Sequence, residues 1–132
     1  MTVRSNSVMD KVRCTGWLAV LGLMLWLDLP SAHAEDASIQ SAFNARYRNY
    51  FGSESQSLLP FSTLEKPAWQ ELQQTRKLEE VYREADKYYN SKVYTFTLYR
   101  DVQNGQYYLD AKGGFWGMDE LIYGPIDKAE LL

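Results

Sequence analysis

The chain has 132 residues, a net charge of −3, one cysteine and one histidine. Cys14 and His33 both lie within the first 34 residues, so residues 35–132 contain neither type. For that part of the chain, this excludes a Ser-His-Asp triad, a thiol nucleophile, disulfides and ordinary zinc sites. The acidic balance argues against nucleic acid as a partner, because nucleic-acid-binding proteins carry clustered basic residues.

Residues 1–34 show the three parts of a secretory signal peptide. A basic start precedes the apolar run from Cys14 to Leu27, and the small residues Ala32 and Ala34 follow. The run is shorter than the roughly 20 apolar residues that cross a bilayer, so we expect cleavage after Ala34. An uncleaved signal segment is the alternative, and it is the only membrane contact expected. The pattern predicts a periplasmic or secreted protein of the bacterial envelope, with residues 35–132 forming a single small domain.

Two helices are predicted at the start of this domain. Apolar residues at positions 39–51 recur at helical spacing, and Gly52 suits the end of that helix. Pro67 suits the first turn of a second helix, which is predicted to continue to about Tyr89. Trp69 lies off the apolar stripe of this second helix, so its first turns are expected to contact something different from the rest.

A β-hairpin is predicted around Asn104 and Gly105, a pair that favours a two-residue type I′ turn. With Gln103 opposite Gln106, alternation places one set of side chains on the core face, with Arg100 as the exception. The set is Tyr94, Phe96, Leu98, Val102, Tyr107, Leu109 and Ala111. The opposite face, which carries Thr95, Thr97, Tyr99, Asp101, Tyr108 and Asp110, is expected to be either exposed or covered by a helix.

A third strand, at an edge of the sheet, is predicted from Glu120 to Ile126, with Pro125 tolerated at an edge or end. An uncovered edge leaves open a homodimer formed through this strand. The predicted architecture is α+β, with two N-terminal helices packed on a small, about three-stranded antiparallel sheet that has a central β-hairpin.

Two surfaces carry the candidate functional residues. Glycines surround Phe115 and Trp116, whose rings suit either a protein interface or a sugar-stacking platform, or else fold back onto the core. The outer face of the hairpin adds tyrosines, which are frequent at recognition surfaces, and an acidic rim. The predicted partner-binding residues are Tyr99, Tyr108, Asp110, Trp116, Asp119 and Glu120.

These features lead to three hypotheses about function. The first is a non-catalytic protein-binding module, such as an inhibitor, an immunity factor or an accessory subunit of an envelope complex. The second is a ligand or cell-wall glycan binder that uses the same aromatic residues, which a groove lined by Trp116 and two tyrosines would favour. The third is a carboxylate-based hydrolase, which requires two of Asp110, Asp119 and Glu120 to converge in a pocket. No catalytic residue, metal ligand or cofactor is assigned, since nucleotide-binding glycine motifs are also absent from the sequence.

Overall fold

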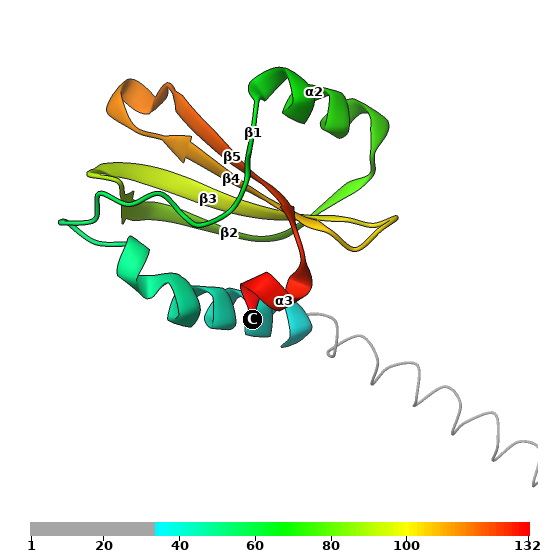
Figure 1. Cartoon of the computed structure of the whole chain (residues 1–132), viewed down its shortest axis with the longest axis horizontal. Helices are drawn as coiled ribbons and strands as arrows, with labels where there is room; N and C mark the ends of the chain where they lie inside the picture. The colour runs from blue at the N-terminus through cyan, green and yellow to red at the C-terminus, as the bar shows by residue number, and fades with distance from the viewer. Residues whose placement is uncertain (1–33) are drawn as a thin grey trace, which may run out of the picture. The chain divides into compact units, whose positions relative to one another are not determined.

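A five-stranded antiparallel sheet in the order β1-β5-β4-β3-β2 forms the centre of the fold. The computed structural model describes residues 34–132, so the predicted signal peptide, apart from Ala34, lies outside the described residues. Residues Asp36–Leu132 form one compact unit, with helices on both sides of the sheet (Figure 1). The α+β prediction is confirmed, whereas the predictions of three strands and of two helices that are both N-terminal are wrong.

The elements follow one another along the chain without long gaps after residue 62. Residues 34–47 are helical and are called the N-terminal helix here. The remaining elements are η1 (Arg48–Tyr50), β1 (Thr63–Leu64), α2 (Lys66–Thr75), β2 (Leu78–Tyr89), β3 (Lys92–Asp101), β4 (Tyr107–Gly113), η2 (Phe115–Gly117), β5 (Asp119–Ile126) and α3 (Lys128–Leu131).

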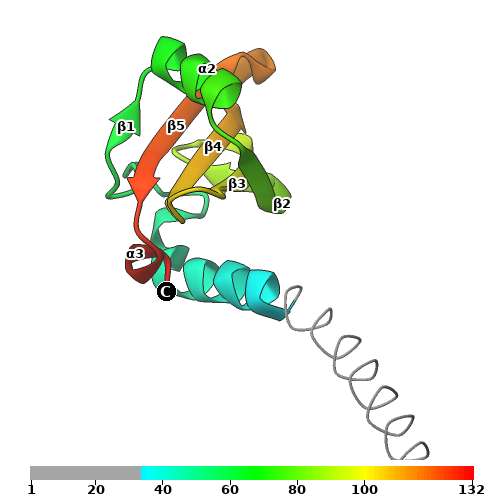
Figure 2. The ribbon, with the colours of Figure 1, turned by 90° about the vertical axis from the view of Figure 1, so that its right-hand side faces the viewer.

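The N-terminal helix covers the inner face of the sheet, as its apolar spacing predicts. Ile39, Phe43 and Tyr47 recur at intervals of four residues, so they share one face of a helix, and all three are buried in the main core. The short helix α3 lies beside this helix (Figure 2), where Arg46 Nη1 donates a hydrogen bond of 2.9 Å to the carbonyl oxygen of Ala129. The chain end is thereby tied to the first helix.

The second predicted helix is correct only for its first ten residues, because β2 begins at Leu78. The register of β2 against β3 is irregular between Glu80 and Tyr82 and again between Glu84 and Lys87. Each β-bulge adds a residue and reverses which side chains face the core. A strand interrupted in this way loses its period of two, and its apolar positions then resemble a helical stripe.

A two-residue turn joins β2 to β3, at a position where no turn is predicted from the sequence. Tyr89 pairs with Lys92, and both intervening residues, Asn90 and Ser91, have positive φ angles of 50° and 64°. This is the backbone that a two-residue type I′ turn requires. The sequence signal at Asn90 was obscured because the preceding strand was assigned to a helix.

The hairpin at Asn104 and Gly105 exists, but with a longer loop than predicted. Residues 102–106 form the loop, and Leu98 pairs with Leu109 instead of Ala111. The predicted register is therefore displaced by two positions. A displacement by two keeps every strand residue on its face, so the predicted core face of β3 and β4 is confirmed. Val102 is the exception, since it lies in the loop and is half exposed.

Strand β5 matches the predicted third strand, but it is not at an edge. It lies between β4 and the two-residue strand β1, whose Thr63 and Leu64 pair with Tyr123 and Ile122. The edges of the sheet are therefore β1 and β2. Strand β1 was not predicted, because the stretch before α2 has no alternating pattern that would indicate a strand.

Candidate functional site

Helix α2 covers part of the outer face of the sheet and divides it into a buried and an open region. Its Trp69 is only 2% exposed and packs on the rings of Tyr99 and Tyr108, with ring centroids 5.5 and 5.7 Å away. Tyr108 is therefore buried in a second apolar cluster together with Ile122. The expectation that Tyr108 is exposed is wrong, because the alternative in which a helix covers this face applies here.

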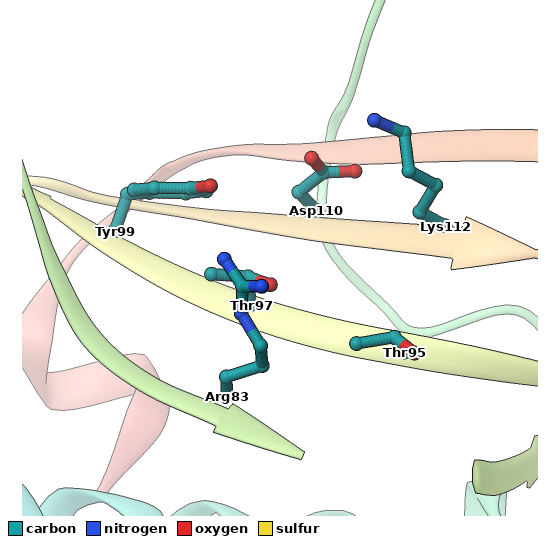
Figure 3. Close-up of a pocket in the computed structure, with 6 residues that line it drawn as sticks. All are labelled: Arg83, Thr95, Thr97, Tyr99, Asp110 and Lys112. Atoms are coloured by element: carbon teal, nitrogen blue, oxygen red, sulfur yellow. The ribbon is translucent and has the colours of Figure 1, made fainter. Parts of the chain in front are cut away.

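Beside α2, the outer face holds two shallow polar hollows that share Tyr99, Asp110 and Lys112, and we call them together the outer-face pocket. One hollow, of about 320 Å³, lies over the middle strands (Figure 3) and is completed by Arg83, Thr95 and Thr97. The other, of about 300 Å³, lies against α2 and is completed by Lys66, Trp69, Gln70, Gln73 and Glu120. Alternation along β3 and β4 directs the pocket residues of these two strands to one face of the sheet.

Asp110 has the most unusual environment in this pocket. Its side chain is 7% exposed, and its Oδ1 atom finds no hydrogen-bond partner among residues 34–132. The pKa of Asp110 is raised to about 7, first by burial and then by the charge of Glu120 beside it. Lys112 and Arg83 act in the opposite direction. Two carboxyl groups that share a site cannot both be ionised at low cost, so this pair holds a proton near neutral pH.

Figure 3 shows how the polar groups of the pocket converge. The hydroxyl of Tyr99 points from β3 toward Asp110, and the guanidinium of Arg83 extends from β2 across the sheet. Arg83 donates a 2.8 Å hydrogen bond to Glu80, and burial raises the pKa of the Tyr99 phenol. Donors and acceptors therefore alternate across a small area of the sheet.

A second candidate site lies between β4 and β5, in the segment from η2 to Met118, which we call the exposed turn. Phe115, Trp116 and Met118 are 70%, 86% and 83% exposed. The rings of Phe115 and Trp116 contact each other edge to face at 5.8 Å between centroids. Both rings point away from the core, so the alternative in which they fold back as a plug does not apply.

The backbone of the exposed turn is closely held at its base. The amide of Gly114 donates a 2.9 Å hydrogen bond to the carbonyl oxygen of Val93, and Lys92 forms a 2.9 Å salt bridge with Asp119. Trp116 adopts a left-handed backbone with a φ of 64°. This conformation costs about 1–2 kcal/mol for a residue with a Cβ atom, whereas glycine would adopt it without that cost.

The structure separates the six predicted site residues into three places. Tyr99, Asp110 and Glu120 line the outer-face pocket. Trp116 is at the summit of the exposed turn, and Asp119 is at its base. Tyr108 lies in the apolar cluster under α2. Neither hollow of the outer-face pocket is a groove lined by Trp116 and two tyrosines, because Tyr99 is the one tyrosine in their linings and Trp116 is in neither.

Sequence reasoning missed Arg83 and Lys112 as pocket residues. Lys112 follows Asp110 by two positions on the same strand, so strict alternation would have placed both on the outer face. Arg83 could not be found in that way, because the residues of β2 were predicted to be helical.

Among residues 34–132, no helix is long and apolar enough to cross a membrane, and no three side chains of the metal-binding types converge. In comparisons with known proteins, the chain matches no family model, no curated protein and no solved structure at a significant level. Its function must therefore be argued from the two candidate sites alone.

Proposed function

We propose that the protein is an exported, non-catalytic protein-binding module of the cell envelope, and that it binds its partner through the exposed turn. The observation that carries this proposal is the simultaneous exposure of Phe115, Trp116 and Met118 on a closely held turn. Large apolar side chains in contact with water reduce stability relative to burial. Clustered at one end of the sheet, they form the kind of patch that marks an interaction site.

The identity and backbone of Trp116 support a role in recognition. Tryptophan is one of the three residue types most frequent at the energetic centre of protein interfaces. Here it occupies a position with positive φ, where glycine would be the less strained choice. Backbone strain of this kind occurs mainly at functional sites. The partner is a protein with an apolar pocket that accepts the indole ring. Lys92 and Asp119, the charged residues at the base of the turn, already pair with each other, so the apolar side chains carry the contact.

The export part of the proposal rests on the sequence of residues 1–34, with its basic, apolar and small-residue parts. The non-catalytic part rests on the residue types available after position 34. The third hypothesis, a carboxylate hydrolase, is favoured by the convergence of Asp110 and Glu120 in one pocket. However, the raised pKa of Asp110 places Glu120 directly beside it, whereas the two carboxyl groups of glycosidases are about 5–5.5 Å apart in retaining enzymes and further apart in inverting ones.

Site-specific crosslinking tests this function. A photoreactive phenylalanine derivative replaces Trp116 in the full chain expressed in its host, and the same derivative replaces Val102 as a control. Val102 is half exposed and lies in the loop at the other end of the sheet (Figure 1). We expect one protein crosslinked from position 116 and not from position 102.

Binding of that purified protein is then compared between variants. Trp116→Ala is expected to weaken binding by at least about 30-fold, the effect of a hot-spot residue, while Val102→Ala leaves it within about twofold. Identical crosslinking patterns from both positions, or unchanged affinity in Trp116→Ala, would refute the exposed turn as the binding surface.

A further inference from the structure

The outer-face pocket contains an acceptor atom that the protein itself does not use. Asp110 is 7% exposed, lines both hollows, and has an Oδ1 atom without a hydrogen-bond partner among the described residues. Buried polar atoms are normally paired, and leaving one unpaired costs about 1–3 kcal/mol. A donor group on a ligand would supply the missing hydrogen bond. The unpaired Oδ1 atom of Asp110 therefore favours a ligand with a donor group in this pocket.

The size and lining of the pocket restrict the ligand. Hollows of about 320 and 300 Å³ are at the lower end of the range for ligand sites, which suits one or two sugar-sized rings. Around Asp110, the floor and rim carry the hydroxyls of Thr95 and Thr97 and the cationic groups of Arg83 and Lys112 (Figure 3). A lining of this kind gives an acyl chain or a steroid little apolar surface to bury.

The charges of the pocket disfavour a charged ligand of either sign. Lys66, Arg83 and Lys112 lie around it, so an ammonium group would meet several like charges. Arg83 already forms a 2.8 Å salt bridge with a neighbouring glutamate, and the carboxyl groups of Asp110 and Glu120 face the same pocket, so the positive charge is largely offset and an anion gains little. A neutral ligand that carries several hydroxyl groups avoids both conflicts, because each hydroxyl donates to a carboxyl oxygen and accepts from a cationic side chain.

We propose that the outer-face pocket binds a neutral saccharide, one of whose hydroxyl groups donates a hydrogen bond to Oδ1 of Asp110. Arg83 and Lys112 donate to other oxygens of the same ligand, and the hydroxyl of Thr97 completes the floor. This site is separate from the exposed turn, so the inference does not depend on the proposed protein partner.

A nuclear magnetic resonance titration tests the proposal with the isotope-labelled full chain. The probes are D-glucose, N-acetylglucosamine and N,N′-diacetylchitobiose, each added to millimolar concentrations. We expect saturable shifts of the backbone amides of Thr97, Asp110 and Lys112 with at least one probe. Asp110→Ala is expected to weaken binding about tenfold, the loss of one hydrogen bond. Val102→Ala, outside the pocket, should leave the affinity unchanged.

A second variant keeps the test decisive if Asp110→Ala does not fold. Thr97→Val replaces a hydroxyl with a methyl group of similar size in a residue that is 6% exposed and lines the pocket, and it should weaken binding several-fold. Absence of saturable shifts with all three sugars would overturn the proposal. So would equal affinity in the parent and both pocket variants, or a stronger response to methylammonium or inorganic phosphate than to any sugar.

Discussion

Two tryptophans in opposite environments give a direct test of the fold. Trp69 is 2% exposed and holds α2 on the sheet, whereas Trp116 is 86% exposed in the turn between β4 and β5. A buried tryptophan removes about 200 Å² from water, which at about 25 cal/mol per Å² corresponds to roughly 5 kcal/mol. Truncation to alanine in a core usually costs about 3–5 kcal/mol. We therefore expect Trp69→Ala to lower the free energy of unfolding by about 4 kcal/mol.

The matched variant Trp116→Ala makes the same chemical change where almost no area is buried. It keeps the left-handed backbone of position 116, so neither burial nor strain changes much, and the free energy of unfolding should stay within about 0.5 kcal/mol. Urea denaturation followed by far-ultraviolet circular dichroism measures both variants. Trp69→Phe provides a milder truncation if Trp69→Ala is too unstable to purify, since small domains have only about 5–15 kcal/mol in total. A cost below about 1 kcal/mol for Trp69→Ala would refute the packing of α2 described above.

Three further predictions concern the buried charges and one glycine. Because the pKa of Asp110 is raised to about 7, the folded chain holds a proton between about pH 4 and 7 that the unfolded chain has lost, so this group lowers stability as pH rises through that window. Asp110→Asn should therefore raise the free energy of unfolding by about 2 kcal/mol at pH 8, after allowance for solvent screening, and by little at pH 4; urea titrations at both values would show an equal effect if the idea is wrong. Arg76 lies 2.8 Å from the fully buried Asp101 and lowers the pKa of that carboxyl. Arg76→Ala should cost about 2 kcal/mol at pH 7, and the cost should decline as the pH falls below about 4 and through the lowered pKa of Asp101; a pH-independent cost would contradict the ion pair. Gly113→Ala would place a Cβ atom 2.4 Å from the carbonyl oxygen of Val93 at a φ of 156°, and we expect a loss of about 2 kcal/mol in thermal unfolding, whereas an unchanged melting temperature would show that this contact relaxes freely.

The candidate sites were predictable in part from local sequence. Alternation along the two hairpin strands placed Tyr99 and Asp110 on the same face, and a displacement of the register by two positions did not disturb this result. The glycines around Trp116 indicated a turn, and the turn exists. Whether an aromatic side chain in such a turn faces inward or outward depends on the space available at the end of the core, and local sequence contains no information on that space.

The arrangement of the second helical segment could not be predicted in the same way. Two bulges in β2 disturb its alternation, so Val81, Tyr82 and Tyr89 acquire a spacing that suits a helix as well as a strand. Helical periodicity is a local property, while a bulge is stabilised by pairing with a distant strand. A helix over the residues of β2 can therefore be excluded only when β3 is placed beside them.

By itself, the sequence determined the N-terminal helix, the two faces of the hairpin and the location of Trp116 on a glycine-rich turn, because each follows from residues that are close together in the chain. Only the tertiary structure decided that α2 crosses to the outer face, that Trp69 buries Tyr108, and that Asp110 is left beside Glu120 with an unpaired oxygen. These features arise from contacts between elements that are far apart in sequence. Burial and its electrostatic consequences are properties of such contacts, so they appear only when the elements are packed together.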